Sequence, residues 1–208
     1  MDLNIISYNC RSARLHSELI RLLAEKCDVL FLQETLLNDE NVDVLDTIDG
    51  FNFAHTPSFR RSDTFVGRSS GGLVVMWKNF VQIKFIPFHY NERIMGLKIH
   101  VNELIYLMIN VYCVYDHGDV ESMVQYMDTY AELSNIISDE SCTQTIIAGD
   151  FNCDPNKHPR FFNEFSNFSN EHGMHMCDIN NLPADSYTYV SDNNVSSTST
   201  TCWLQIRR

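Results

Sequence analysis

A carboxylate and a carboxamide lie two positions apart, directly after an apolar run, in TIIAGDFNC, residues 145–153. The run ends at Gly149, and Asp150 and Asn152 follow it. Residues two positions apart on an extended chain point to the same face, so the two side chains would be directed at one place. A carboxylate held by an amide can orient or deprotonate a water molecule. Such a pair also occurs in ordinary turns, so its meaning depends on whether other residues converge there.

Three further predicted strands end in polar side chains that could join this pair: Asn9 after LNIISY, Glu34 after DVLFLQ and Tyr112 after LIYLMINV. In α/β sheets, ligands bind at the carboxyl ends of the strands. If the strands lie side by side and parallel, one edge of a sheet gathers Asn9 and Glu34 with Asp150 and Asn152. Each residue alone has a structural alternative: Glu34 could end a surface turn, Asn9 could bond to the backbone, and Tyr112 could belong to the core.

The converging set is rich in oxygen ligands and contains neither a thiolate nor an imidazole. Such ligands suit Mg²⁺ or Mn²⁺ rather than zinc. A magnesium ion with few protein ligands typically neutralises the oxygens of a phosphate group and the leaving oxygen. The pattern therefore favours metal-dependent phosphate chemistry without a small-molecule cofactor.

The elements that must position these residues are strands with helices at intervals. Apolar runs and alternating patterns predict strands at 3–9, 28–34, 71–78, 80–86, 93–100, 104–112 and 142–149. Helical spacing predicts helices at 16–26, 119–138 and 159–169, and two short strands are expected around SDNN, 191–194. Strands grouped in the middle of the chain, with helices between them, predict two sheets covered by helices, which is an α/β sandwich in layers.

The composition is that of one folded domain, since 208 residues, 44% of them apolar, are enough for a sizeable core. Seven cysteines without CxxC spacing indicate buried or free thiols in a reducing compartment. No secretory segment is recognisable, and the longest apolar run, 104–115, is about half as long as a membrane helix. We therefore expect an intracellular protein of the nucleus or cytoplasm that does not bind a membrane.

The net charge of −12 argues against tight binding of nucleic acid by the whole surface. A local exception is SFRRSDTFVGR, a Gly- and Ser-containing segment that carries Arg60, Arg61 and Arg68. These residues are either solvated loop charges or a rim that binds phosphate groups of a nucleic acid.

Five motifs, ISYNCRS, DVLFLQET, RSSGGLVVMWK, INVY and IIAGDFN, occur in this order and together resemble the endonuclease/exonuclease/phosphatase superfamily. The resemblance is closest to the apurinic-endonuclease-like domain that non-LTR retrotransposons (LINEs) carry beside a reverse transcriptase. It implies a four-layer α/β sandwich of two mixed β-sheets face to face, flanked by helices, and metal-dependent cleavage of DNA phosphodiesters.

The resemblance also implies roles for the residues at the strand ends. Glu34 matches the metal-binding glutamate, and Asn9 the asparagine that supports the metal site. Asp150 and Asn152 match the pair that activates water and holds the phosphate, and Tyr112 the tyrosine that contacts the scissile phosphate. The RSSGG loop and residues 60–68 would then lie on the surface that meets DNA.

The sequence departs from the family pattern near its end. The resemblance places an aspartate where Gln205 stands, and later a Ser-Asp-His run that this sequence does not contain. After Tyr112, CVYDHG replaces a turn that contains proline in relatives. We therefore expect residues 1–204 to form an incomplete, C-terminally truncated domain without its last strands, followed by an aberrant tail at 205–208. Loss of one electrostatic stabiliser such as the histidine costs roughly 10²–10³ in rate.

Two alternatives to DNA nicking remain open from the sequence. The chain could be a catalytically dead domain of retroelement origin that binds nucleic acid or a protein. It could also be a phosphoesterase of the same superfamily with another substrate, such as an inositol phosphate, a phospholipid or an RNA 3′ end.

Overall fold

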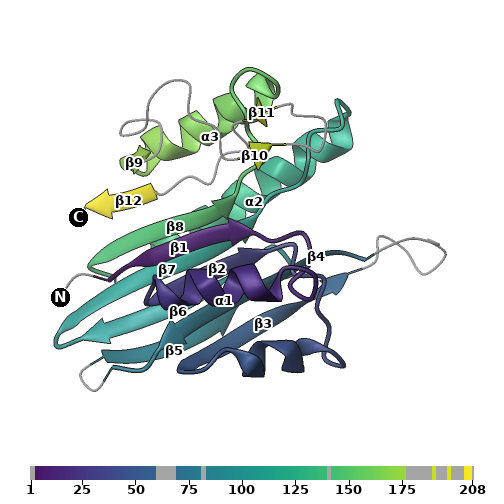
Figure 1. Cartoon of the computed structure of the whole chain (residues 1–208). Coiled ribbons are helices and arrows are strands. Elements are labelled where there is room, and N and C mark those ends of the chain that lie inside the picture. Colours follow the sequence, from purple (N-terminus) through teal and green to yellow (C-terminus); the bar gives the residue numbers. More distant parts are fainter. Residues whose placement is uncertain are drawn as a thin grey trace.

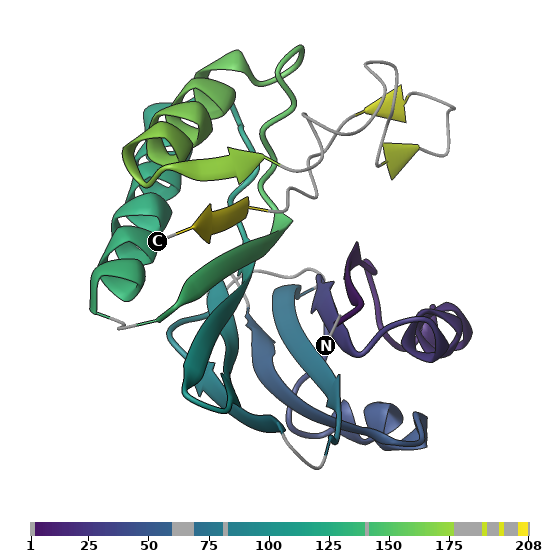
Figure 2. The same ribbon diagram turned by 90° about the vertical axis from the view of Figure 1, so that its left-hand side faces the viewer.

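A computed structural model describes residues 3–59, 69–80, 83–139 and 142–176, together with short strands at 189–190, 196–197 and 204–207. Two β-sheets lie face to face with helices on both outer sides (Figures 1 and 2). The predicted four-layer α/β sandwich is confirmed.

The first sheet has the strand order β1-β2-β4-β3. Its strands are β1 (Ile5–Asn9), β2 (Val29–Gln33), β3 (Phe51–Phe59) and β4 (Ser70–Lys78). β1 and β2 are parallel, and the other neighbours are antiparallel. Every residue of β2 is buried, as its continuous apolar run predicts for a strand covered on both faces.

The second sheet has the order β5-β6-β7-β8-β12-β9. Its strands are β5 (Ile83–His89), β6 (Ile94–Val101), β7 (Leu104–Tyr112), β8 (Gln144–Asp150), β9 (Met174–Met176) and β12 (Leu204–Arg207). β7 and β8 are parallel, and the other neighbours are antiparallel. The backbone of β12 lies between β8 and β9, so residues 204–207 extend this sheet; the predicted domain boundary at 204 stays a prediction. β10 (Tyr189–Val190) and β11 (Ser196–Ser197) form a separate antiparallel pair.

The outer layers are amphipathic helices, each with its apolar side against one sheet. α1 (Ser17–Glu25) and the 3₁₀ helix η1 (Val42–Thr47) cover the first sheet. α2 (Val120–Asp139) and α3 (Pro159–Glu171) cover the second. Pro159 at the first turn of α3 is well placed, because its missing N–H has no partner to lose there.

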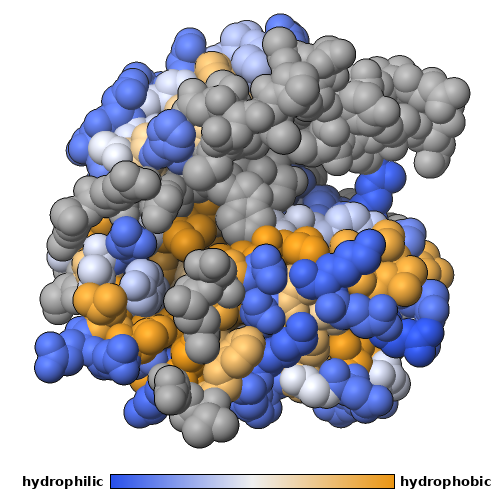
Figure 3. All heavy atoms as spheres, turned by 60° about the vertical axis from the view of Figure 1, so that its left-hand side comes forward, coloured by the Kyte–Doolittle hydropathy of each residue, from blue (hydrophilic) through white to orange (hydrophobic). Residues whose placement is uncertain are grey.

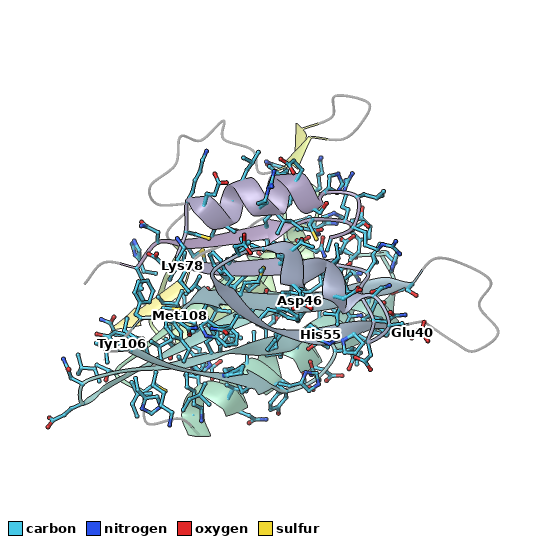
Figure 4. The ribbon with its side chains drawn as sticks, turned by 60° about the horizontal axis from the view of Figure 1, so that its bottom comes forward. Glu40, Asp46, His55, Lys78, Tyr106 and Met108 are labelled. Carbon is cyan, nitrogen blue, oxygen red and sulfur yellow. The ribbon has the colours of Figure 1, made fainter. Side chains whose placement is uncertain are left out.

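The core between the two sheets is formed by inward-facing residues of β2, β4, β6 and β7. Tyr106 and Met108, two positions apart on β7, both belong to this layer (Figure 4). The packing of this apolar layer fixes the distance between the sheets, and thereby the distance between the ends of their strands.

Within the first sheet, the Lys78 ammonium at the far end of β4 lies 3.6 Å from the Asp28 carboxylate.

One predicted strand is displaced along the chain. In place of the strand expected at 80–86, the structure describes a strand from Ile83 to His89, and the Ile83 N–H donates to the Phe80 carbonyl (3.2 Å). The strand then runs through Pro87, which is acceptable because β5 is at the edge of its sheet. The two short strands expected around 191–194 are confirmed as β10 and β11, whereas β9 was not predicted.

Figure 3 shows one face of the molecule, on which apolar surface lies between hydrophilic residues. Leu104, at the start of β7, is exposed. Within the residues that the structure describes, no helix is long and apolar enough to cross a membrane.

Candidate active site

The carboxyl ends of two parallel strand pairs meet at one place. β1 and β2 end together, with Asn9 opposite Gln33, and β7 and β8 end together, with Tyr112 opposite Asp150. The four strands do not share a sheet, so the condition that they all lie side by side is not met. The two pairs belong to facing sheets, and the predicted side chains converge across the interface between them.

Hydrogen bonds join four of the five predicted residues. The Asn9 Nδ2 donates to Glu34 Oε1 (2.8 Å) and to Asp150 Oδ2 (2.7 Å). The Tyr112 hydroxyl donates to the same Glu34 oxygen (3.2 Å). One amide group therefore holds two carboxylates together, and a phenol is directed at one of them.

Asn152 lies next to this network but uses its side chain differently. β8 ends at Asp150, and Asn152 has a left-handed backbone (φ 50°). Its side-chain amide donates to the Cys113 carbonyl (2.8 Å), and its backbone N–H donates to Asp150 Oδ1 (3.1 Å). The prediction that Asn152 points to the same place as Asp150 is therefore wrong. Asn152 holds the ends of β7 and β8 together and orients Asp150 through its backbone N–H.

The backbone around the site is constrained at two positions. A Cβ at Gly149 would lie 1.9 Å from the Val111 carbonyl oxygen, so only glycine lets β8 approach β7 this closely before Asp150. Glu34 has a φ of 51°, an uncommon value for a residue with a side chain. This conformation turns the chain at the end of β2, and the turn brings the Glu34 carboxylate against Asn9.

The Asp150 carboxylate is buried, and burial raises its pKa to about 6. The hydrogen bonds from Asn9 and Asn152 lower the pKa in part, while the negative charge of Glu34 raises it further. A carboxylate with a pKa of about 6 is mostly ionised at neutral pH and is more basic than an exposed aspartate. Burial and the nearby carboxylates also raise the pKa of Tyr112, so its hydroxyl remains a hydrogen-bond donor.

The family of this chain follows from its sequence and agrees with this geometry. A family model described as the Endonuclease/Exonuclease/phosphatase family matches residues 6–204. The chain belongs to this family.

Solved structures of similar fold cover nearly the whole chain. NExo from Neisseria, a 3′ phosphatase whose structure contains a product DNA hairpin, has a TM-score of 0.74 and 16% identity over 99% of this chain and 87% of its own. An AP endonuclease from Archaeoglobus fulgidus has a TM-score of 0.69 and 14% identity over 98% and 86%. The human Nocturnin catalytic domain has a TM-score of 0.67 and 16% identity over 98% and 82%. At these identities the similarity shows the fold. No curated protein matches the chain.

A buried pair of amides behind the site was missed by the sequence reasoning. Gln33 and Asn110 are fully buried on β2 and β7, and the Gln33 Nε2 donates to Asn110 Oδ1 (2.7 Å). The Asn110 Nδ2 donates to the carbonyls of Leu32 (3.1 Å) and Val74 (3.0 Å). The pair connects the two sheets one residue before Glu34 and two before Tyr112. Its signal was a polar residue inside an apolar run in both DVLFLQET and LIYLMINVY.

The glycines of RSSGG support the chain behind Glu34. The N–H groups of Thr35 and Leu36 donate to the carbonyls of Gly72 (3.1 Å) and Gly71 (3.2 Å). A Cβ at Gly72 would lie 2.6 Å from Thr35 Oγ1, so this close approach requires glycine. The other predicted DNA-binding residues, Arg60, Arg61 and Arg68, lie outside the described residues.

The donor set fits a divalent cation that keeps most of its water. One oxygen of Glu34 and one of Asp150 lie within hydrogen-bond distance of the same Asn9 nitrogen. In the described part of the chain, no group of three or more His, Cys, Asp and Glu side chains is placed to hold a metal ion. The Asn9 Oδ1 accepts from the Arg11 N–H (3.2 Å), so the oxygens that face the amide nitrogen are those of the two carboxylates. Two carboxylates, completed by water and phosphate oxygens, are typical of Mg²⁺ rather than of a structural metal. None of the described cysteines forms a disulfide bond within the described residues.

Proposed function

We propose that the chain is a divalent-metal-dependent phosphodiesterase that nicks DNA, derived from the endonuclease domain of a non-LTR retroelement. The observation that carries the proposal is the Asn9 amide held between Glu34 and the buried Asp150, with Tyr112 on the same Glu34 oxygen. The order of the five sequence motifs supports the retroelement origin.

Each residue has a role that its surroundings favour. Asp150 is oriented by Asn9 and by the Asn152 backbone, and above its pKa of about 6 it accepts the proton of an attacking water. Glu34 would hold Mg²⁺ or Mn²⁺, and Asn9 would support this metal site through its hydrogen bond to the Glu34 carboxylate. The ion, when bound, neutralises charge on the phosphate and on the leaving oxygen. Tyr112 remains a neutral phenol and donates to a phosphate oxygen in place of Glu34.

Two observations support DNA as the substrate. The five motifs resemble those of the endonuclease domain of non-LTR retrotransposons, and the NExo structure contains a DNA hairpin. The net charge of −12 disfavours recognition by a broad basic surface. Substrate contacts are therefore local to the end of the two strand pairs.

Comparison of substrates tests this proposal against the other activities of the family. Purified protein is incubated in Mg²⁺ buffer with one substrate at a time, and turnover is measured. The substrates, at equal concentration, are supercoiled plasmid, a 3′-phosphorylated oligonucleotide and a soluble inositol phosphate. We expect internal nicks in the plasmid and slow release of phosphate from the other two substrates. Faster turnover of either small phosphoester would overturn the assignment to DNA, and turnover of none would favour a binding domain.

A further inference from the structure

An exposed aromatic residue lies on the loop that leaves the candidate active site. Tyr115 is three residues after Tyr112, and its surface is 51% exposed. The loop begins at the site, because the Cys113 N–H donates to the Asp150 carbonyl (2.8 Å) and the Cys113 carbonyl accepts from Asn152 (2.8 Å). The position of Tyr115 is therefore tied to the ends of β7 and β8.

The other end of this loop is anchored by Arg160 on α3. The Arg160 Nε donates to both oxygens of Asp116 (2.9 Å each), and its terminal nitrogens donate to the Asp119 carbonyl (2.9 Å) and the Ser122 hydroxyl (3.0 Å). A loop held at both ends is already ordered in the free protein. Its side chains therefore lose little conformational entropy when a ligand binds.

Two imidazole rings pack edge-on against the Tyr115 ring. The ring of His117 lies 5.5 Å away at 64°, and the ring of His158 lies 5.0 Å away at 77°. His158 comes from the segment after β8, so the three rings join the two loops that follow the parallel strands of the second sheet. A single exposed tyrosine is ordinary on a protein surface. A tyrosine fixed by two other rings at the rim of a phosphodiesterase site is a surface suited to a flat ligand.

The charged residues beside the Tyr115 loop disfavour binding of phosphate groups. A cavity of about 620 Å³ adjoins the loop and is lined by His117 and Arg93 together with acidic residues. Its acidic lining residues are Glu92, Asp119, Glu121, Asp128 and Glu132. Because these carboxylates outnumber the arginine of the lining and repel phosphates, this surface favours an uncharged part of the DNA. The faces of the bases are that part, and they stack on aromatic side chains regardless of sequence.

We propose that Tyr115, held in place by His117 and His158, stacks on an unpaired base of the DNA strand whose phosphate lies at Glu34 and Asp150. This inference rests on the proposed function and specifies its substrate as DNA with an unpaired base beside the cleaved bond. From the usual contribution of one stacked base, removal of the ring weakens binding roughly tenfold.

Fluorescence of 2-aminopurine reports stacking directly. The probe is placed in a hairpin oligonucleotide, either unpaired at the duplex end or paired within the duplex. Binding is measured in Mg²⁺ with the Asp150→Asn protein, so that the DNA stays intact, and with Tyr115→Ala, Tyr115→Phe or Leu104→Ala added. Leu104 is 43% exposed at the opposite end of β7 and serves as the matched control. Nicking of plasmid is measured separately with proteins that retain Asp150.

We expect quenching of the unpaired probe only, an about tenfold higher Kd with Tyr115→Ala, and unchanged binding with Tyr115→Phe and Leu104→Ala. If Tyr115→Ala quenches the probe and binds the DNA as well as the protein with Tyr115, and its unfolding midpoint is unchanged, the stacking proposal is overturned. This holds even if the protein nicks plasmid. Quenching that depends on Tyr115, in a protein that nicks nothing, would support stacking and reject the proposed activity. Absence of any quenching by the protein with Tyr115 would overturn the stacking proposal as well.

Discussion

Asn9 and Asp150, 141 positions apart in the sequence, are joined by a 2.7 Å hydrogen bond between their side chains. Asn9 ends β1 in the first sheet, and Asp150 ends β8 in the second. The same Asn9 amide donates to Glu34, so one side chain connects the two sheets at the point where both carboxylates lie. The site depends on how the sheets face each other as much as on either sheet alone.

Replacement of Asn9 by alanine should slow DNA cleavage roughly 10- to 100-fold, the usual cost of losing a residue that orients a metal-site carboxylate. Without the shared donor, Glu34 and Asp150 repel each other and lose their common orientation. Initial nicking rates over a range of Mg²⁺ concentrations measure the effect. Asn4→Ala, at the exposed start of the same chain segment, is the control, since the bond from Asn4 to Asp28 uses its backbone N–H. Equal rates for Asn9→Ala and Asn4→Ala would contradict the role of the bridge.

Asp150 should make the metal-free protein less stable as the pH rises. Its pKa is about 6 in the folded chain, above its ordinary value of 3.8, so between these values the folded state holds a proton that the unfolded state has released. The stabilisation is complete below about pH 4 and is lost as the pH rises through 6, by roughly 3 kcal/mol for such a shift. Glu34 increases this dependence, and Arg11 decreases it.

Urea unfolding in EDTA between pH 4 and 7.5 measures this contribution. The free energy of unfolding of the wild type, minus that of Asp150→Asn, should fall across the range, because the amide does not titrate. A difference that stays constant or rises with pH would show that burial does not raise the pKa of Asp150.

Removal of the Asn110 side chain should destabilise the protein by more than about 2 kcal/mol. Asn110→Ala takes the side-chain donor away from the carbonyls of Leu32 and Val74 in the interior. Gln33 Nε2 loses the Asn110 oxygen and keeps its bond to the Ser7 hydroxyl oxygen (3.1 Å). Each buried group left unpaired costs about 1–3 kcal/mol. Urea unfolding measures the loss. Asn163→Ala on the exposed side of α3 should change stability by less than about 0.5 kcal/mol. Similar effects of the two substitutions would mean that the amide pair is not structural.

The substitution Gly149→Ala should push β7 and β8 apart, because its Cβ would lie 1.9 Å from the Val111 carbonyl oxygen. We expect it to destabilise the protein by several kcal/mol or to abolish cooperative folding. Gly118 also has a positive φ (82°), but no atom lies within 4 Å of a Cβ built there. Gly118→Ala should therefore cost only about 1 kcal/mol for the backbone conformation. Thermal unfolding of the two variants side by side separates the steric term from the conformational one. Equal midpoints would reject the close approach of the strands.

The sequence predicted which strands end in the polar residues of the candidate site, because apolar runs followed by Asn9, Glu34, Tyr112 and Asp150 are local patterns. It could not predict that the four strands belong to two sheets, since pairing depends on contacts between distant segments. The sequence also could not predict where the Asn152 side chain points, because the chain leaves the extended conformation after Asp150. Gln33 and Asn110 appeared in quoted motifs, but only the three-dimensional structure shows that they bond to each other across the sheets.

Nicking of supercoiled plasmid by the purified protein in Mg²⁺ tests the central claim most directly, measured beside EDTA and beside Asp150→Asn and Glu103→Asn. Glu103 lies in the exposed turn between β6 and β7, at the other end of the strands, and controls for the loss of a carboxylate. We predict that the wild type and Glu103→Asn nick the plasmid at equal rates in Mg²⁺ and that EDTA or Asp150→Asn abolishes nicking. Nicking that persists in EDTA, or that Asp150→Asn leaves unchanged, would contradict the assignment of the site.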